Sequence, residues 1–397
     1  MKKPIIHELQ NLPVPDKDAL EQSRRLTAVI LAGIDANNGQ IGFDRFMHMA
    51  LYQPGLGYYS AGARKFGRDG DFTTAPETSP LFSICIARQC EQIFNESGSA
   101  VIFELGAGTG IMACDILMEL RQRNALPTQY MILETSADLR QRQQQLLQQR
   151  HADIYDRLVW LDRLPDKALN GIIVANEVLD ALPVHRMCKR NNTFYEMLVA
   201  RDGNSFLWQQ SINEFMPELM QHALGGLVQE LPDGYKTEYN ALLAPFIESL
   251  SAVLGTGAIL LIDYGYPRRE YYHPQRTDGT LACYCRHRKH ANPFLYTGIQ
   301  DITASVDFTL AAESAHASGL DIYGFTTQAG FLVSCGLEKI IAEISAGNDK
   351  AFLRNTQQAG KLILPSEMGE SFKVMMLGKN LHVPLIGAGF GSHIHRL

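Results

Sequence analysis

The sequence lacks the features that would place a protein in a membrane, in a secretory pathway or on nucleic acid. No apolar run approaches the roughly 18 residues that a membrane span needs. The opening segment MKKPIIHELQ carries lysines but no apolar stretch of signal-peptide length. The formal net charge is −6, whereas a nucleic-acid-binding surface is usually basic. We therefore expect no membrane span and no nucleic-acid partner.

Cysteine is sparse and forms no C-x-x-C pair. The chain has seven cysteines scattered over 397 residues, and an odd number in a chain of this length indicates reduced thiols rather than a disulfide framework. This composition favours a cytoplasmic location. The pattern C-x-C-x-H-x-x-H from Cys283 to His290 matches no common zinc spacing, and no second cluster completes it. We therefore expect no metal.

The N-terminal part of the chain is predicted to be helical, with one long loop. Hydrophobic periodicity predicts helices over residues 16–35, 43–52 and 81–95. Residues 55–80, which we call the lid segment, are rich in glycine, proline, serine and threonine. A loop of this length in a compact domain is often functional, and its aromatic side chains favour an ordered lid over disorder.

Strands and helices alternate over most of the remaining sequence. This rhythm predicts an α/β fold whose mostly parallel sheet is covered by helices on both faces. Residues 184–254 break the rhythm and read as an insertion, with two or three antiparallel strands over 184–210 and helices near 212–223 and 239–254. The expected sheet strands are 100–105, 130–134, 157–161, 171–177, 258–265 and 372–379, with helices at 111–123 and 137–150.

The segment ELGAGTG, residues 104–110, is the central functional signal. Its glycines lie between a strand and a helix, where backbone amides at the helix N-terminus point toward a ligand. Glu134 ends the next strand, 24 residues after Gly110, and a carboxylate there can accept bonds from the two ribose hydroxyls of a nucleoside. A glycine-rich strand–helix turn without a ligand is the alternative interpretation.

The spacing of the glycines favours S-adenosylmethionine over a dinucleotide. Glu104 precedes the first glycine by two residues, and a carboxylate there repels a pyrophosphate but suits the α-ammonium group of a methionine. Trp160 stands where an adenine would lie, either stacked on the base or as part of the core. The expected cofactor contacts are Glu104, Gly106, Ala107, Gly108, Gly110, Glu134, Thr135, Trp160, Leu161 and Asn176.

Polar side chains follow the fourth expected strand. Asn176, Glu177 and Asp180 come directly after an apolar run, and ligands of open parallel sheets bind beyond the carboxyl ends of the strands. Carboxylates there can hold a guanidinium nucleophile in bidentate fashion beside the sulfonium methyl. The alternative is that the two acids cap a following helix. Asp263 ends the fifth strand, and Tyr284 and His287 follow in a loop, so we expect them near the cleft.

Several motifs together resemble the MidA family of class I methyltransferases, which includes a mitochondrial complex I assembly factor that methylates an arginine. The resemblance covers nearly the whole chain, and the combination of GDFTTAPE, NEVLDALPVH and DITASVDF is specific. The matching motifs are FMHMALYQPGLGYYS (46–60), GDFTTAPETSPLF (70–82), FELGAGTG (103–110), ETSADLRQRQ (134–143), NEVLDALPVHR (176–186), DYGY (263–266), GTLACYCRHRKH (279–290), DITASVDF (301–308), TTQAGFL (326–332) and MGESFKVM (368–375).

The resemblance implies a Rossmann-like sheet of seven strands, with an N-terminal helical and lid segment over 1–98 and a methyltransferase domain over 99–397. It implies that Asp71, Thr73 and Glu77 in the lid segment touch cofactor or substrate. It also implies a protein substrate methylated at arginine and a link to respiratory complex assembly. From their places beside the expected cleft, Glu177, Asp180, Asn176 and His287 are the expected catalytic residues. Ser305 departs from the family, which commonly has histidine there, so either this chain does without that imidazole or another group such as His287 replaces it.

Two other functions stay open at this level. One is a cofactor-binding assembly factor that acts by holding a partner on the insertion, and the other is a nucleotide-dependent oxidoreductase, which the glycine spacing disfavours. A homodimer is also open.

Overall fold

The computed structural model describes residues 12–61 and 73–397. These residues form two compact units, each made of stretches that are far apart in the sequence. The domain boundaries predicted at residues 98, 184 and 254 stay a prediction. The sheet unit comprises residues 73–179, 243–267 and 306–397, and the companion unit comprises residues 180–242, 268–305 and the described part of residues 1–72.

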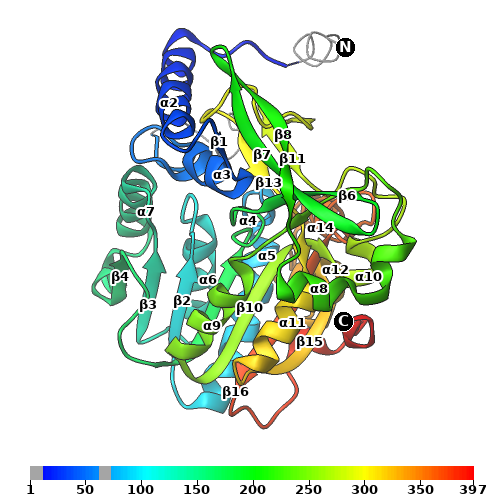
Figure 1. The fold of residues 1–397 in the computed structure, drawn as a ribbon. Coiled ribbons are helices and arrows are strands. Elements are labelled where there is room, and N and C mark those ends of the chain that lie inside the picture. Colours follow the sequence, from blue (N-terminus) through cyan, green and yellow to red (C-terminus); the bar gives the residue numbers. More distant parts are fainter. Residues whose placement is uncertain (1–11, 62–72) are drawn as a thin grey trace. The chain divides into compact units, whose positions relative to one another are not determined.

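The sheet unit contains the predicted α/β fold (Figure 1). In the described chain its strands run in the order β15, β16, β10, β5, β2, β3 and β4, and short β14 pairs with β10. Neighbours from β10 to β4 pair in parallel, whereas β16 is antiparallel to β10 and β15. The mostly parallel sheet is thus confirmed, with seven strands in one row and short β14 as an eighth. The bounds are β2 Val101–Leu105, β3 Gln129–Leu133, β4 Leu158–Leu161, β5 Leu169–Asn176, β10 Leu254–Tyr266, β14 Val306–Asp307, β15 Asp321–Thr327 and β16 Phe372–Lys379.

Helices cover both faces of this sheet. Figure 1 draws α9 and α11 in front of β10, with α5 behind it. None of the described helices is both long and apolar enough to cross a membrane. The helices of the sheet unit are α4 Ala75–Thr78, α5 Pro80–Ser97, α6 Ile111–Gln122, α7 Ala137–Arg150, α9 Leu243–Val253, α11 Phe308–Ala317, α12 Gln328–Ser334, α13 Leu337–Ile344 and α14 Asp349–Ile363, with short 3₁₀ turns η1 Ala152–Arg157, η3 Ile386–Ala388 and η4 Ile394–Arg396.

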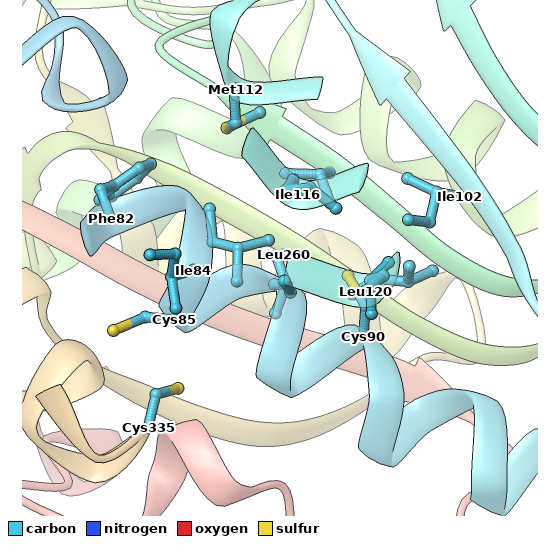
Figure 2. Close-up of a cluster of buried hydrophobic side chains, with 14 of the residues drawn as sticks. Phe82, Ile84, Cys85, Cys90, Ile102, Met112, Ile116, Leu120, Leu260 and Cys335 are labelled. Carbon is cyan, nitrogen blue, oxygen red and sulfur yellow. The ribbon is translucent and has the colours of Figure 1, made fainter. Parts of the chain in front are cut away.

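The core of the sheet unit lies between α5, α6 and the sheet. Alternate residues of the parallel strands point to this face, as the period of a β-strand requires. Figure 2 shows Phe82 and Ile84 from α5 packed near Met112 and Ile116 from α6, with Leu260 of β10 beside them. Because both faces of the central strands are covered, these strands are mostly apolar, and the sequence shows them as hydrophobic runs.

The companion unit contains the N-terminal helices and most of the predicted insertion. The side chain of Asp16 accepts the backbone N–H of Ala19 at 2.8 Å and so caps the first helix where it was predicted to begin. Its elements are α2 Lys17–Asp35, α3 Phe43–Tyr52, α8 Glu218–Leu224, η2 Gly225–Glu230 and α10 Arg268–Tyr271, a sheet of β1 Gln40–Ile41, β6 His185–Arg190, β7 Thr193–Asp202, β8 Ser205–Glu214 and β9 Lys236–Tyr239, and a sheet of β11 Ala282–Cys285, β12 Arg288–His290 and β13 Asp301–Thr303.

Two secondary-structure predictions need correction. The helix expected near 212–223 begins only at Glu218, because β8 continues to Glu214, where it pairs with Tyr195 past an irregularity in the ladder. Strand β15 was not predicted. Its register against β16 shifts between Ile322 and Gly324, and this irregularity removes the strict alternation that reveals a strand in a sequence.

Two glycines permit the close approach of the central strands. Gly171 in β5 has φ +143°, and an added Cβ would collide with the carbonyl oxygen of Val101 in β2. Gly257 in β10 has φ +139°, and an added Cβ would collide with the carbonyl oxygen of Gly171.

We expect Gly171→Ala to destabilise the protein by about 2–4 kcal/mol through backbone strain and steric overlap. The loss would be measured as a lower midpoint in urea denaturation.

Gly360 in α14 provides the matched control, because its Cβ position is 3.7 Å from Leu364 and has room. Alanine in a helix interior is favoured over glycine by about 0.5–1 kcal/mol, so Gly360→Ala should raise the midpoint slightly. A Gly171→Ala protein as stable as the wild type would contradict the described approach of β5 to β2.

Candidate functional site

The glycine turn, residues 106–110, joins β2 to α6 through three left-handed residues. Gly106, Gly108 and Gly110 have φ values of +63°, +53° and +83°, and Gly110 caps α6. The N–H of Gly106 donates to the carbonyl oxygen of Leu133 at 3.0 Å, so the turn is attached to the end of β3. Glycine adopts this conformation without the steric cost that a Cβ brings. The turn therefore requires its glycines before any ligand is considered.

The space around two of these glycines is occupied by protein. A Cβ on Gly110 would lie 3.2 Å from Cγ of Gln143, and one on Gly106 would lie 3.4 Å from Cγ2 of Val178. The predicted reason for glycine at these positions is the close approach of a ligand. The packing of α7 against the turn is a second reason for glycine at position 110. The segment after β5, which contacts the turn through Val178, is a second reason for glycine at position 106.

Glu104 is buried inside the sheet unit below the turn. The residue is only 1% exposed, and its Oε2 accepts a hydrogen bond from the hydroxyl of Tyr130 at 2.6 Å. Burial raises the pKa of Glu104 to about 7, the hydrogen bond from Tyr130 lowers it, and the charge of Glu134 adds to the increase. Near neutral pH this carboxyl is therefore close to half-protonated, and a nearby cation would favour its ionised form.

Glu134 presents a carboxylate held from two sides. Oε1 accepts the backbone N–H of Ser136 at 2.9 Å, and Oε2 accepts Nε2 of Gln143 at 2.9 Å. Arg140 donates to the carbonyl oxygens of Glu134 and Leu161 at 3.1 and 2.8 Å, which ties the ends of β3 and β4 together. Glu134 was predicted from the sequence, whereas Gln143 and Arg140 were not.

Trp160 in β4 is a half-buried residue that packs against the core of the sheet unit. Its indole Nε1 donates to Oε1 of Gln143 at 3.1 Å, and its ring lies 5.9 Å from that of Tyr155. Packing in the core, one of the two predicted alternatives, is thus present, and stacking on an adenine stays a prediction. Among the other expected cofactor contacts Ala107 is buried, Leu161 half-buried and Thr135 exposed.

The described end of the lid segment contacts the glycine turn. The hydroxyl of Thr109 donates to Oε1 of Glu77, which lies in α4. This bond places Glu77 beside the turn, and its role in a lid stays a prediction. Thr73 is exposed, and Asp71 lies outside the described residues.

The segment after β5 also borders the turn. Glu177 has φ +53°, its N–H donates to the carbonyl oxygen of Ile262 at 2.9 Å, and its Oε1 accepts Nδ2 of Asn176 at 3.3 Å. A non-glycine residue in this conformation is strained by roughly 1 kcal/mol or more, and such strain occurs often at functional sites. The next element is strand β6, so the alternative that these acids cap a helix is wrong.

Asp263 occupies the end of β10 and is fully buried. Its Oδ2 accepts the N–H of Leu179 at 2.9 Å, and its Oδ1 accepts the N–H of Tyr264 at 2.9 Å. These bonds hold the segment after β5 in place. The described contacts of Asp263 are therefore structural, and its expected role toward substrate stays a prediction.

Asp180 belongs to the companion unit, where three of the quoted motifs meet. The hydroxyl of Tyr59 donates to Oδ1 of Asp301 at 3.0 Å, and the N–H of Ala304 donates to the carbonyl oxygen of Asp180 at 3.0 Å. Burial raises the pKa of Tyr59 well above its usual value, and the charges of Asp301 and Asp180 raise it further. Tyr59 therefore stays protonated and donates.

Comparison with known proteins identifies the family. A family described as "Putative S-adenosyl-L-methionine-dependent methyltransferase" matches residues 85–326. A crystal structure from Burkholderia thailandensis, bound to S-adenosyl-homocysteine, is 40% identical and covers 98% of this chain and 100% of its own, with a TM-score of 0.92. A native crystal structure from the same organism is 39% identical over the same shares, with a TM-score of 0.89.

This chain belongs to that methyltransferase family. The resemblance to the MidA family, the class I methyltransferase fold and the choice of S-adenosylmethionine over a dinucleotide are confirmed, and the oxidoreductase alternative is excluded. Curated relatives include "Protein arginine methyltransferase NDUFAF7, mitochondrial" from Danio rerio, 27% identical over 84% of this chain and 82% of its own. The homologue from Drosophila melanogaster is 27% identical over 89% and 84%.

The cytoplasmic location expected from the cysteines is contradicted by this comparison, because the curated relatives are named as mitochondrial proteins. Reduced thiols do not distinguish a cytoplasmic protein from a mitochondrial one. All seven cysteines are indeed free, and only Cys188 is not buried.

Two expected substrate residues of the methyltransferase lie on a hairpin of the companion unit. Tyr284 is half-buried in β11, with Nζ of Lys289 6.0 Å from its ring centre. His287 is exposed in the turn between β11 and β12, where Arg286 and His287 both have positive φ, at +46° and +61°. The hairpin turn explains the positive φ of His287. The catalytic role of His287 stays a prediction.

In the described part of the methyltransferase, one group of side chains lies close enough together to share a metal ion. This group does not include the residues of the C-x-C-x-H-x-x-H pattern. Its members are Asp44, His185 and Glu196. Nδ1 of His185 lies 2.7 Å from Oε1 of Glu196 and 3.7 Å from Oδ1 of Asp44. Burial lowers the pKa of His185, but the hydrogen bond and both negative charges outweigh burial and raise it. The two carboxylates therefore favour the protonated form of His185.

The residues of the sheet unit fit S-adenosylmethionine. Three left-handed glycines stand in the turn at the N-terminus of α6, and a carboxylate stands at the end of the next strand. A carboxylate has roughly four acceptor positions, which is the acceptor chemistry that the two hydroxyls of a ribose require. The glycine turn and Glu104 would then face the amino-acid end.

The raised pKa of Glu104 predicts how the stability of the cofactor-free protein depends on pH. A carboxyl whose folded pKa is raised from 4.5 to about 7 makes folding less favourable as pH rises through this window. Above pH 8 the cost is about 3 kcal/mol. Glu104→Gln keeps an acceptor for Tyr130 and removes the charge, so it should be more stable than the wild type at pH 8, with a difference that shrinks toward pH 5.

Urea denaturation of both proteins at several pH values measures this difference. A stability difference that does not change between pH 5 and pH 8 would contradict the raised pKa of Glu104.

Proposed function

We propose that this methyltransferase transfers the methyl group to a guanidinium nitrogen of an arginine side chain in a protein. The curated relatives, which match more than 80% of this chain and of their own lengths, are named as protein arginine methyltransferases. The observation that carries the proposal is the position of Glu177. It follows β5, and its neighbour Val178 lies against the Cβ position of Gly106 in the glycine turn.

The chemistry of the acceptor explains why an acid belongs there. A guanidinium ion is positively charged and presents two N–H groups in a plane, which a carboxylate binds in bidentate fashion. Glu177 would hold the guanidinium and favour the nitrogen that attacks. Asn176, which donates to Oε1 of Glu177, would fix the orientation of that carboxylate. The strained backbone of Glu177 supports this role, because strain persists where the surrounding structure enforces it.

The bound cofactor supplies an electrophilic methyl group on a sulfonium centre. The chain aligns the acceptor, excludes water and accepts the proton that the guanidinium loses. The carboxylate of Glu177 is the proposed proton acceptor, since it would already hold the guanidinium that loses the proton. Glu134 would bind the ribose, and Glu104 would balance the charge of the α-ammonium group.

The remaining assignments are part of the same proposal. Asp180 and His287 are proposed to act on the substrate, and Asp71, Thr73, Glu77, Asp263 and Tyr284 are proposed to line the lid and the substrate path. The two-domain division, a homodimer, the absence of a nucleic-acid partner and a link to respiratory complex assembly also stay predictions.

Transfer to arginine is tested with S-adenosylmethionine that carries a labelled methyl group. The purified protein is incubated with a lysate of cells that lack it, and the labelled protein bands are hydrolysed for amino-acid analysis. We expect label in a discrete band and recovery of the label as methylarginine. Glu177→Gln should lower the initial rate by about 100-fold or more, since a general base typically contributes 10²–10⁴-fold, while S-adenosyl-homocysteine affinity stays within about threefold.

Gly108→Val serves as a control that is expected not to bind cofactor, because a β-branched residue does not tolerate the φ of +53° at this position. Label recovered as methyl-lysine or as a base-labile methyl ester would contradict the arginine proposal. A stable partner that co-purifies without label would instead favour the assembly-factor alternative.

A further inference from the structure

Gln143 is a buried amide in a helix of exposed glutamines. Helix α7 has the sequence ADLRQRQQQLLQQR, and its buried residues are Leu139, Gln143 and Leu147, spaced four apart on one stripe. Gln143 is fully buried, whereas Gln145 on the same helix is exposed. A buried primary amide costs free energy unless its donors and acceptor find partners.

Both polar groups of this amide are used. Nε2 donates to the carbonyl oxygen of Gly108 at 2.9 Å and to Oε2 of Glu134 at 2.9 Å. Oε1 accepts the indole N–H of Trp160 at 3.1 Å. A rotated amide would place its oxygen against two acceptors and its NH₂ group against a donor, so the three partners fix one orientation.

The same residue also packs on the glycine turn. Its Cα, Cβ and Cγ atoms lie 3.2–3.4 Å from the position of a Cβ on Gly110. Gln143 therefore contacts each group to which the sequence assigns part of the cofactor: the turn for the amino-acid end, Glu134 for the ribose and Trp160 for the side of the adenine.

We propose that Gln143 is the positioning residue of the cofactor site, with an NH₂ group that fixes the ribose-binding carboxylate of Glu134 relative to the glycine turn before the cofactor arrives. The inference rests on the proposed placement of S-adenosylmethionine at residues 104–134. Ser136 fixes one oxygen of Glu134 and Gln143 the other, so the carboxylate has one orientation. Pre-orientation improves affinity because less freedom is lost on binding.

The two donors of Gln143 make glutamate the informative substitution. Gln143→Glu keeps the size and the acceptor for Trp160 but removes both donors and sets a second carboxylate against Glu134. We expect it to weaken the affinity for S-adenosyl-homocysteine by about 100-fold at pH 8. At pH 6 the introduced carboxyl group can be protonated and donate one bond again, so part of the affinity should return. Gln143→Met, which has neither donor, should lose about tenfold at both pH values.

The experiment measures binding by calorimetry with two probes, S-adenosyl-homocysteine and 5′-methylthioadenosine, which lacks the amino-acid end. Because Gln143 acts through the ribose carboxylate, both probes should lose affinity by the same factor. Gln145→Glu, on the exposed face of α7, is the matched control and should bind both probes within twofold of the wild type. Circular dichroism establishes that each variant is folded, and Gln143→Met carries the test if Gln143→Glu fails to fold.

Two results would overturn the proposal. The first is a folded Gln143→Met protein whose affinity for both probes is within twofold of that of the wild type. The other is a loss confined to S-adenosyl-homocysteine, because that would place the effect at the amino-acid end. Neither result depends on the methyl acceptor, so arginine transfer can fail while this inference holds. A wild-type protein that binds neither probe would refute the cofactor placement itself.

Discussion

The backbone between β2 and α6 has to pass through three left-handed residues, and the rest of the candidate site depends on that turn. Its first N–H is bonded to the end of β3, its last residue caps α6, and α7 packs on it through Gln143. The segment after β5 lies against Gly106. The turn thus fixes the relative positions of the groups proposed to bind cofactor, and only glycine satisfies its backbone without strain.

Buried acids lie at or near the carboxyl ends of β2, β3 and β10, and their partners decide what each can do. Glu104 has a single hydrogen bond, from Tyr130, among those described, and its pKa is raised to about 7 by burial. Glu134 has donors on both oxygens, and Asp263 holds two backbone N–H groups. A buried carboxylate with well-placed donors is both stable and rigid, whereas one with few donors responds to an arriving cation. The site combines both kinds.

The sequence revealed the fold because the central strands are apolar runs and the turns between them carry glycine. It revealed Glu134 and Glu177 because both follow such runs directly, at the edge where parallel strands end. It did not reveal β15, whose register shift near Gly324 hides the alternation. Nor did it reveal Gln143, which stands among many glutamines. The spacing of Leu139, Gln143 and Leu147 was the available signal, because it sets this one glutamine on the apolar stripe.

The surroundings of a side chain were harder to infer from the sequence. The glycines were explained by a ligand, and the structure adds that Gly110 lacks room for a side chain because of α7. Asp263 was expected in the cleft because of its place at a strand end, and the structure adds that its oxygens accept two backbone N–H groups. Position along a strand can be inferred from a sequence, whereas the direction of a side chain depends on neighbours that are distant in the sequence. The location was inferred from cysteines, which report redox state and not compartment.

The most direct measurement of the central claim is a crystal structure of this protein soaked in S-adenosyl-homocysteine. The account predicts the amino-acid end of the ligand over residues 106–110 and the ribose hydroxyls within about 3 Å of the Glu134 carboxylate. A ligand bound elsewhere, or a Glu134 side chain turned away from the ribose, would contradict it.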